Sequence, residues 1–379
     1  MTFHSVETGG VPIPDLSALG TALRDRPRGA DAPFPREAWA AIAETGLFGE
    51  LVDASRTPAE RMTRTLAALE RLGETCEDGG FGFSVVTHIA STVSSLSQFG
   101  TPEARARFLP DLIAGRLVGA HAISEPEAGS DALAMRARAV RDGDAYVLTA
   151  EKAFVTNGPI ADVVVVYAKT GAGDGVGDVS AFLVPTDLPG VRPGPAMSKV
   201  GLVTSPLGTL SLEGVRVPAS HRLGREGSGF FILSWVMKRE ILLAFMVQVG
   251  EMRRRIERCV RFVNERRQFG ATIGSFQSVS NRIADMRIRY ELSRAYLLQA
   301  AEKLTSSKDA TTDIAVAKVF VSEAAIATAL DALHIHGGKG FLAETGLGAA
   351  LCDAVAGTIY SGTNDIQRGR IAAMMGVKQ

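Results

Sequence analysis

Cysteine is scarce in this sequence. The three that occur, Cys76, Cys259 and Cys352, are odd in number and far apart. Their spacing matches neither a disulfide framework nor a set of metal ligands. Since disulfides are rare where thiols are kept reduced, the pattern predicts a protein of the reducing cytoplasm.

Three further features are missing, and each argues against a class of protein. Lys and Arg together number 41, and Asp and Glu together also number 41. The chain therefore has no net charge to attract nucleic acid or an anionic membrane. No apolar run approaches the length that spans a bilayer. The first residues show neither the basic start nor the apolar core of a signal peptide. We therefore expect a globular protein with neither nucleic acid nor membrane as a partner.

The hydrophobic periodicity changes twice along the 379 residues, which predicts three domains, at 1–116, 117–226 and 227–379. The first and third are expected to be helical and the second to be a β domain, so the fold class is mainly α with a central β domain. Residues 1–30 are expected to form a loose lead-in and 171–177 a flexible hairpin tip. The predicted helices cover 36–46, 59–76, 83–99, 101–115, 230–267, 277–306, 313–336 and 364–375; the predicted strands cover 118–124, 134–141, 145–149, 163–169, 179–184 and 209–215.

The segment 123–131 contains residue types that suit a ligand-binding loop. Glu125 precedes a proline and cannot continue a helix. Gly129 lets a ligand approach the backbone closely, and Ser124 and Ser130 offer hydroxyls on either side. A surface turn at the end of a strand explains the same residues equally well.

Phe154 and Thr156 alternate with Val155, so on a strand they share one face. An aromatic ring beside a hydroxyl suits a flat heterocycle. From the residues alone, an ordinary half-buried strand is the more frequent explanation.

Two segments of the third domain invite a functional interpretation. Arg266 opens the sequence Arg-Arg-Gln-Phe-Gly and is a natural partner for a pyrophosphate, although a basic helix end also favours arginine. His334 and His336 precede Gly337 and Gly338, a typical helix C-cap. Histidines two apart on a helix do not face one site, so no metal is expected there.

These segments, together with Tyr-Ser-Gly-Thr at 360–363 and the Ile-Gln-Arg that follows, resemble the motifs of the acyl-CoA dehydrogenase family. The resemblance implies an N-terminal helical domain, a middle β-barrel-like domain and a C-terminal four-helix bundle, assembled as a homodimer or homotetramer. It also implies FAD as the cofactor, with the 266–277 block contacting the FAD of a neighbouring subunit. The residues that it assigns to FAD are Ser124, Gly129, Ser130, Phe154, Thr156, Arg266, Gln268, Phe269, Gln277, His334, Gly338, Thr363 and Asp365, and those that it assigns to the substrate are Ser130, Tyr360 and Gly362.

The catalytic base has to come from a different place than in many members of the family. They carry a Glu after the Tyr, where this sequence has Ser361, whose hydroxyl cannot remove a carbon-bound proton. Glu240 is the candidate because its neighbours three and four residues away are apolar and cannot pair with it. Isovaleryl- and long-chain-type members have their base at the matching position. A buried Glu that meets an Arg from another helix is the alternative. Glu251, with Arg254 and Arg255 on its own helix face, is expected to be a solvated ion-pair residue.

Ile241 stands where members usually have Arg, and with the Ser361 motif it resembles prolyl-carrier-protein dehydrogenases of natural-product pathways. The resemblance implies FAD-dependent oxidation of an acyl thioester, on a carrier protein or CoA, to the enoyl thioester. Glu240 would act as base, Ser361 would donate a backbone N–H, and a hydride would pass to flavin N5. An electron-transfer flavoprotein or oxygen would then reoxidise the flavin. A flavin-dependent monooxygenase or oxidase on the same fold, or a non-catalytic flavoprotein, remains open as an alternative.

Overall fold

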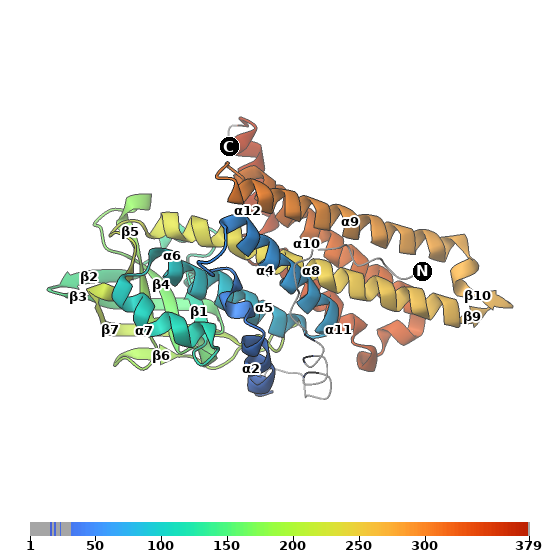
Figure 1. Ribbon diagram of the computed structural model, residues 1–379, viewed down its shortest axis with the longest axis horizontal. Coiled ribbons are helices and arrows are strands. Elements are labelled where there is room, and N and C mark those ends of the chain that lie inside the picture. Colours follow the sequence, from blue (N-terminus) through green and yellow to red (C-terminus); the bar gives the residue numbers. More distant parts are fainter. Residues whose placement is uncertain (1–15, 17–18, 20–22, 24–31, 378–379) are drawn as a thin grey trace.

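The chain forms helices, then a sheet, then helices again, as the periodicity predicts (Figure 1). The computed structural model describes residues 16, 19, 23 and 32–377. The predicted lead-in over 1–30 falls outside this range except for Leu16, Leu19 and Leu23. These three side chains are buried in the helical core, so at these positions the prediction of a loose segment is wrong.

Two of the first helices begin directly after a capping threonine, Thr57 or Thr101, that is followed by a proline. Thr57 accepts a hydrogen bond from Glu60 N, and Glu60 Oε2 accepts one from Thr57 N, which closes a capping box. The single helix predicted over 83–99 is two α-helices joined by a π-helical turn, His88–Val93, a geometry that is frequent at functional sites. The helices of this part are α2 (Arg36–Glu44), α3 (Leu47–Glu50), α4 (Pro58–Thr75), α5 (Gly79–Thr87), α6 (Ser94–Phe99) and α7 (Pro102–Ile113).

The middle segment folds into an eight-stranded sheet with the order β6-β7-β3-β2-β4-β5-β8, in which β1 also pairs with β4. The pairs β1–β4 and β2–β4 are parallel and the others antiparallel. β3 runs on to Thr156, well past the predicted end at 149, through a register shift between Lys152 and Val155. The strands are β1 (Gly119–Ala122), β2 (Arg138–Asp142), β3 (Ala145–Thr156), β4 (Val163–Lys169), β5 (Val179–Pro185), β6 (Val191–Pro193), β7 (Leu207–Pro218) and β8 (Arg222–Leu223).

The two faces of β4 meet different surroundings, and this positions the site. Val164 and Val166 point into the core on one side of the sheet. Val163, Val165 and Tyr167 belong to a second core that contains residues of α6, α7 and α8. Tyr167 therefore faces the helices.

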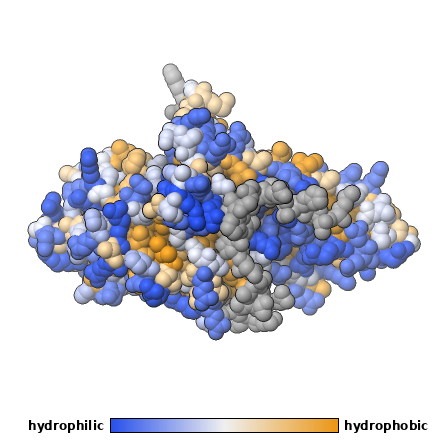
Figure 2. Space-filling model, in the orientation of Figure 1, coloured by the Kyte–Doolittle hydropathy of each residue, from blue (hydrophilic) through white to orange (hydrophobic). Residues whose placement is uncertain are grey.

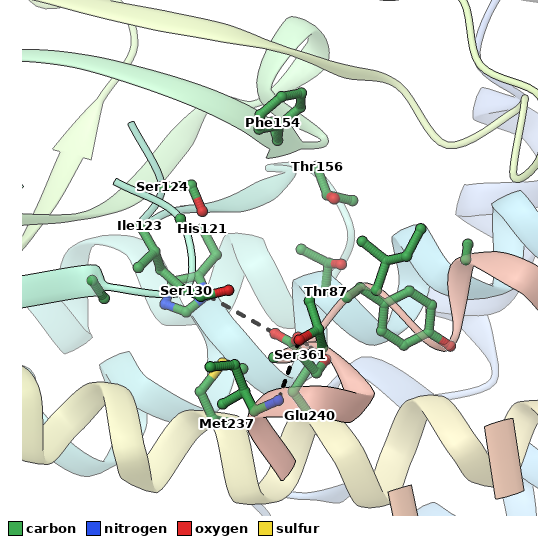
Figure 3. Close-up of a pocket in the computed structure, with 18 of the residues that line it drawn as sticks. Thr87, His121, Ile123, Ser124, Ser130, Phe154, Thr156, Met237, Glu240 and Ser361 are labelled. Atoms are coloured by element: carbon green, nitrogen blue, oxygen red, sulfur yellow. Dashed lines mark hydrogen bonds and ion pairs between the residues drawn. The ribbon is translucent and has the colours of Figure 1, made fainter. Parts of the chain in front are cut away.

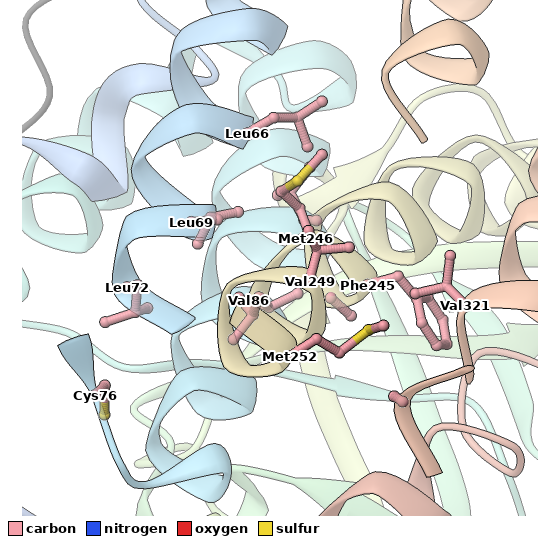
Figure 4. Close-up of a cluster of buried hydrophobic side chains, with 14 of the residues drawn as sticks. Leu66, Leu69, Leu72, Cys76, Val86, Phe245, Met246, Val249, Met252 and Val321 are labelled. Atoms are coloured by element: carbon pink, nitrogen blue, oxygen red, sulfur yellow. The ribbon is translucent and has the colours of Figure 1, made fainter. Parts of the chain in front are cut away.

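The third segment is dominated by α8, which runs the whole length of the bundle (Figure 1). Leucines of α4 pack against Met246, Val249 and Met252 of α8, and Val321 of α10 closes the other side (Figure 4). Neither α11 nor the short β-hairpin is among the predicted elements. The elements are α8 (Gly229–Glu265), β9 (Arg267–Gln268), β10 (Ala271–Thr272), α9 (Gln277–Thr305), α10 (Thr311–His336), α11 (Leu347–Ala356) and α12 (Asn364–Met374).

The prediction that Glu251 is solvated is wrong. Its carboxylate accepts a hydrogen bond from Arg255 at 2.8 Å, and both side chains are buried. The pairing along the helix is as predicted. The burial follows from the packing of other helices on this turn of α8, which the local sequence does not reveal.

The outside of the molecule, in the view of Figure 2, is mostly hydrophilic, with hydrophobic side chains gathered in separate patches. Within residues 32–377, no helix is both long and apolar enough to cross a membrane.

Candidate active site

A cavity of about 660 Å³ lies where α5, α8 and the start of α12 meet the sheet (Figure 3). Its lining comes from segments that are far apart in the sequence. It brings together ten of the predicted site residues: Ser124, Gly129, Ser130, Phe154, Thr156, Glu240, Tyr360, Ser361, Gly362 and Thr363.

Glu240 projects from α8 into this cavity, and its carboxylate is held by two serine hydroxyls. Ser361 Oγ donates to Oε1 at 2.5 Å, and Ser91 Oγ donates to Oε2 at 3.0 Å. Burial raises the pKa of Glu240, and these two hydrogen bonds oppose the rise because they favour the ionised form. The arrangement provides a proton acceptor with a raised proton affinity.

His121 lies beside this carboxylate and was missed in the sequence. Its Nδ1 is 3.9 Å from Glu240 Oε2, and its Nε2 is hydrogen-bonded to Tyr167 Oη at 3.0 Å. Burial, assisted by the charge of Lys152, lowers the pKa of His121 to about 3, so the ring is neutral. A polar side chain in the otherwise apolar segment Gly119–Ala122 was the signal that could have revealed it.

Ser361 sits in a turn with an uncommon backbone. Its φ is 55° and that of Gly362 is 81°, both in the left-handed region. The turn is held by Gln367 Nε2, which donates to Ser361 O at 3.0 Å, and by Thr363, whose hydroxyl caps α12. These contacts hold the hydroxyl of Ser361 on Glu240.

The loop before β2 is fixed by a buried ion pair. Lys152 Nζ donates to Glu125 Oε1 at 2.9 Å and to Ile123 O at 3.0 Å. The backbone N–H groups of Arg136 and Ala137 donate to the same Glu125 carboxylate. Ser124 and Ser130 are thereby held on the cavity wall.

The opposite wall fits a large flat cofactor. Phe154, at the register shift of β3, has a φ of 55° and remains 63% exposed, while Val155 is buried and Thr156 again lines the cavity. A Cβ added at Gly129 would meet nothing within 4 Å, which leaves room against the backbone. An exposed ring, a neighbouring hydroxyl and an open loop suit a stacked isoalloxazine, so these residues fit FAD.

Seven predicted residues do not line the cavity. Asp365 is exposed on α12, one turn away. The remaining six, Arg266, Gln268, Phe269, Gln277, His334 and Gly338, lie around the end of the bundle opposite the sheet (Figure 1).

This end cannot reach the cavity of its own chain. Glu240 and the C-terminal end of α8 belong to one helix and are roughly 38 Å apart at a rise of about 1.5 Å per residue. Phe269, at the tip of the hairpin, is 96% exposed with a φ of 50°. Beside Gly338, Phe341 is 84% exposed. An exposed aromatic and a cluster of arginines suit a nucleotide, but not one bound in the same chain's cavity.

No group of three or more His, Cys, Asp or Glu within the described part of the chain is arranged to hold a metal ion. The helix–sheet–helix fold, the buried carboxylate and the flavin-shaped wall define an FAD-dependent dehydrogenase of acyl thioesters.

The chain belongs to the acyl-CoA dehydrogenase family. Three family models match it in succession: the N-terminal domain over residues 23–116, the middle domain over 120–215 and the C-terminal domain over 227–376.

Among its relatives is an L-prolyl-[peptidyl-carrier protein] dehydrogenase of a Serratia species, 39% identical over 83% of this chain and 81% of the relative. Among solved structures, PigA with FAD and proline has a TM-score of 0.89 at 35% identity, covering 96% of this chain and 93% of that one. The prolyl acyl carrier protein oxidase AnaB has a TM-score of 0.87 at 36% identity, covering 90% and 91%.

Proposed function

We propose that this dehydrogenase oxidises an acyl group that is bound as a thioester to a carrier protein, and that Glu240 is its base. The observation that carries the proposal is the environment of Glu240. Its partners are two hydroxyls and a neutral imidazole, and among the described residues no cation pairs with it. A buried carboxylate without a cation is costly unless it has a function.

In this proposal the chain holds the thioester so that its α-carbon faces Glu240. Backbone N–H groups of the Ser361–Gly362 turn would donate to the thioester carbonyl and stabilise the negative charge that develops there. Glu240 would take the α-proton. FAD, held by Ser124, Gly129, Ser130, Phe154, Thr156 and Thr363, supplies the acceptor for the hydride from the β-carbon when it is bound. Tyr360 would form part of the acyl wall.

Two observations favour a carrier protein over CoA. Two of the relatives named above, the Serratia dehydrogenase and AnaB, are named for prolyl groups on carrier proteins. Ile241, where a cation is usual, is buried in the core. Arg239, its neighbour, stacks on Trp235 at 3.4 Å from the ring centroid. Neither side chain gives the active site a positive charge for the phosphates of CoA.

Anaerobic mixing of the holoenzyme with prolyl thioesters, one on a carrier protein and one on CoA, tests this function. We expect the carrier-bound group to bleach the flavin faster. Equal or faster bleaching by the CoA thioester would overturn the choice of carrier. No bleaching by any acyl thioester would overturn the function itself.

We further propose that two subunits share each FAD. The residues of one subunit that would reach the FAD of another are Arg266, Gln268, Phe269, Gln277, His334 and Gly338, and Asp365 would lie near that FAD. The variants Glu240→Gln and Arg266→Ala, each inactive alone, should then restore activity when they are mixed. In mixed dimers, one site per dimer regains both residues, so about a quarter of the parent activity should return on random mixing. Absence of any recovery, with mixed oligomers present, would contradict shared sites.

The remaining parts of the proposal are a homodimer or homotetramer, a cytoplasmic location, and domain boundaries at 116/117 and 226/227.

An electron-transfer flavoprotein or oxygen is the proposed electron acceptor. Anaerobic reoxidation of the reduced enzyme by an added electron-transfer flavoprotein distinguishes the two acceptors.

A further inference from the structure

Thr87, at the end of α5, carries a hydroxyl without a partner among the residues that the structure describes. Only 3% of the residue is exposed, and it lines the active-site cavity (Figure 3). Some helical threonines of this chain bond the preceding turn, as Thr65 does to Arg61 O at 2.8 Å. Among the described residues, none forms a hydrogen bond with the hydroxyl of Thr87. The hydroxyl opens onto the cavity, where a polar group of a ligand can satisfy it.

The other polar side chains around the acyl end of the cavity are already engaged. The hydroxyl of Ser91 is bonded to Glu240, and the imidazole of His121 is bonded to Tyr167. The hydroxyl of Tyr360 accepts from Gln248 Nε2 at 3.0 Å. Unlike these three side chains, Thr87 has no described partner and is available to bind a substrate atom.

Thr87 also lies close to where the reaction would take place. It precedes Ser91, which touches the base, by four residues, about one helical turn. One turn before it on α5, the ring of Phe83 packs on that of Tyr360 with centroids 4.3 Å apart. An acyl group whose α-carbon faces Glu240 would then lie in the same cavity as this hydroxyl and the two rings.

We propose that Thr87 is a specificity-determining residue that binds a nitrogen on the acyl group, so that the enzyme selects aminoacyl thioesters over hydrocarbon ones. The proposal rests on the function proposed above and goes further by naming the residue that recognises the acyl group. A threonine hydroxyl accepts from an ammonium or secondary amine N–H and donates to a neutral amine. A hydrocarbon acyl group in the same place would displace water from the hydroxyl without giving it a new hydrogen bond. A site that hydrogen-bonds its substrate discriminates strongly against such an analogue.

The test compares two isosteric substrates, prolyl and cyclopentanecarbonyl thioesters on the same carrier protein, which differ by NH against CH2. Their rate constants for flavin bleaching are measured anaerobically with the parent, Thr87→Val and Thr87→Ser holoenzymes. We expect the parent to prefer the prolyl group by about tenfold or more, the worth of one hydrogen bond in a desolvated site. Thr87→Val should lose about tenfold of this preference, while Thr87→Ser, which keeps the hydroxyl, should retain it.

An unchanged preference in Thr87→Val overturns the role of Thr87 while leaving the proposed function intact. If neither thioester bleaches the parent flavin, the proposed function fails and the role of Thr87 fails with it. A structural defect would slow both substrates equally and leave their ratio unchanged, which also counts against the proposal. Should Thr87→Val not retain FAD, the same ratio is measured with Thr87→Ala.

Discussion

The hydroxyl of Ser361 donates a 2.5 Å hydrogen bond to the carboxylate of Glu240, across 121 positions of the sequence. In many relatives the position of Ser361 itself carries the base. Here the hydroxyl orients a carboxylate that comes from α8, and it favours the charged form that accepts a proton. In the proposed mechanism the two residues would divide a task that a single Glu performs in those relatives.

Glu240→Gln should abolish flavin reduction while FAD remains bound. The amide preserves the shape of the side chain but cannot accept a proton, and general-base assistance contributes roughly 10²–10⁴-fold. Anaerobic stopped-flow bleaching with the carrier-bound substrate measures the loss. A variant that bleaches at the parent rate would mean that Glu240 is not the base.

Ser361→Ala should change the pH dependence more than the limiting rate. Removing the hydroxyl raises the pKa of Glu240 further, because one of the hydrogen bonds that lower it is lost. The rate rises with pH as Glu240 ionises, so its midpoint should move to higher pH. Above that midpoint the rate should stay within about tenfold of the parent. Ser91→Ala, which removes the other hydrogen bond, should shift the profile in the same direction.

A pH profile of Ser361→Ala that overlays the parent, or a variant that is inactive at every pH, would contradict this division of roles.

The buried carboxylate of Glu240 should lower the free energy of unfolding at high pH, where it is ionised. Its pKa is raised in the folded state by burial, so its contribution to stability is present at low pH and is lost as the pH rises through the folded pKa. Glu240→Gln should therefore melt at a higher temperature than the parent, by a margin that grows as the pH rises above 4.5, the ordinary pKa of a glutamate, and levels off above the folded pKa. Glu265→Gln, exposed at the end of the same helix, is the control and should show no such trend. An equal margin at all pH values would refute the expectation.

Lys152→Met should destabilise the loop that carries Ser124 and Ser130. The change leaves Glu125 buried without its ion-pair partner, and breaking such a pair typically costs about 3–5 kcal/mol. We expect a lower melting temperature and a lower FAD content in the purified protein. Lys308→Met, at an exposed position, should change neither. A Lys152→Met variant with parental stability and full FAD would show that the backbone donors suffice to hold Glu125.

The prediction of helices, then strands, then helices is confirmed because each element is specified locally. Thr57 and Thr101 with their following prolines mark helix starts, and the apolar periodicity marks the buried faces. The family could be recognised from short sequence motifs, because the turns around Gly129 and Gly362 require particular residue types. Glu240 stood out because the residues beside it on its own helix cannot pair with it.

What the sequence could not reveal depends on contacts between distant segments. Ser91, His121 and Thr87 approach Glu240 or the cavity only because the π-helical turn and the helix-facing side of the sheet pack on α8. The burial of Glu251 and the extension of β3 to Thr156 have the same origin. The sequence by itself determined the order of the elements, the family and the isolated carboxylate, because these depend on neighbours within a few residues. Only the tertiary structure decided which hydroxyls and which imidazole surround that carboxylate, because burial and hydrogen bonding across the chain arise when the helices and the sheet pack together.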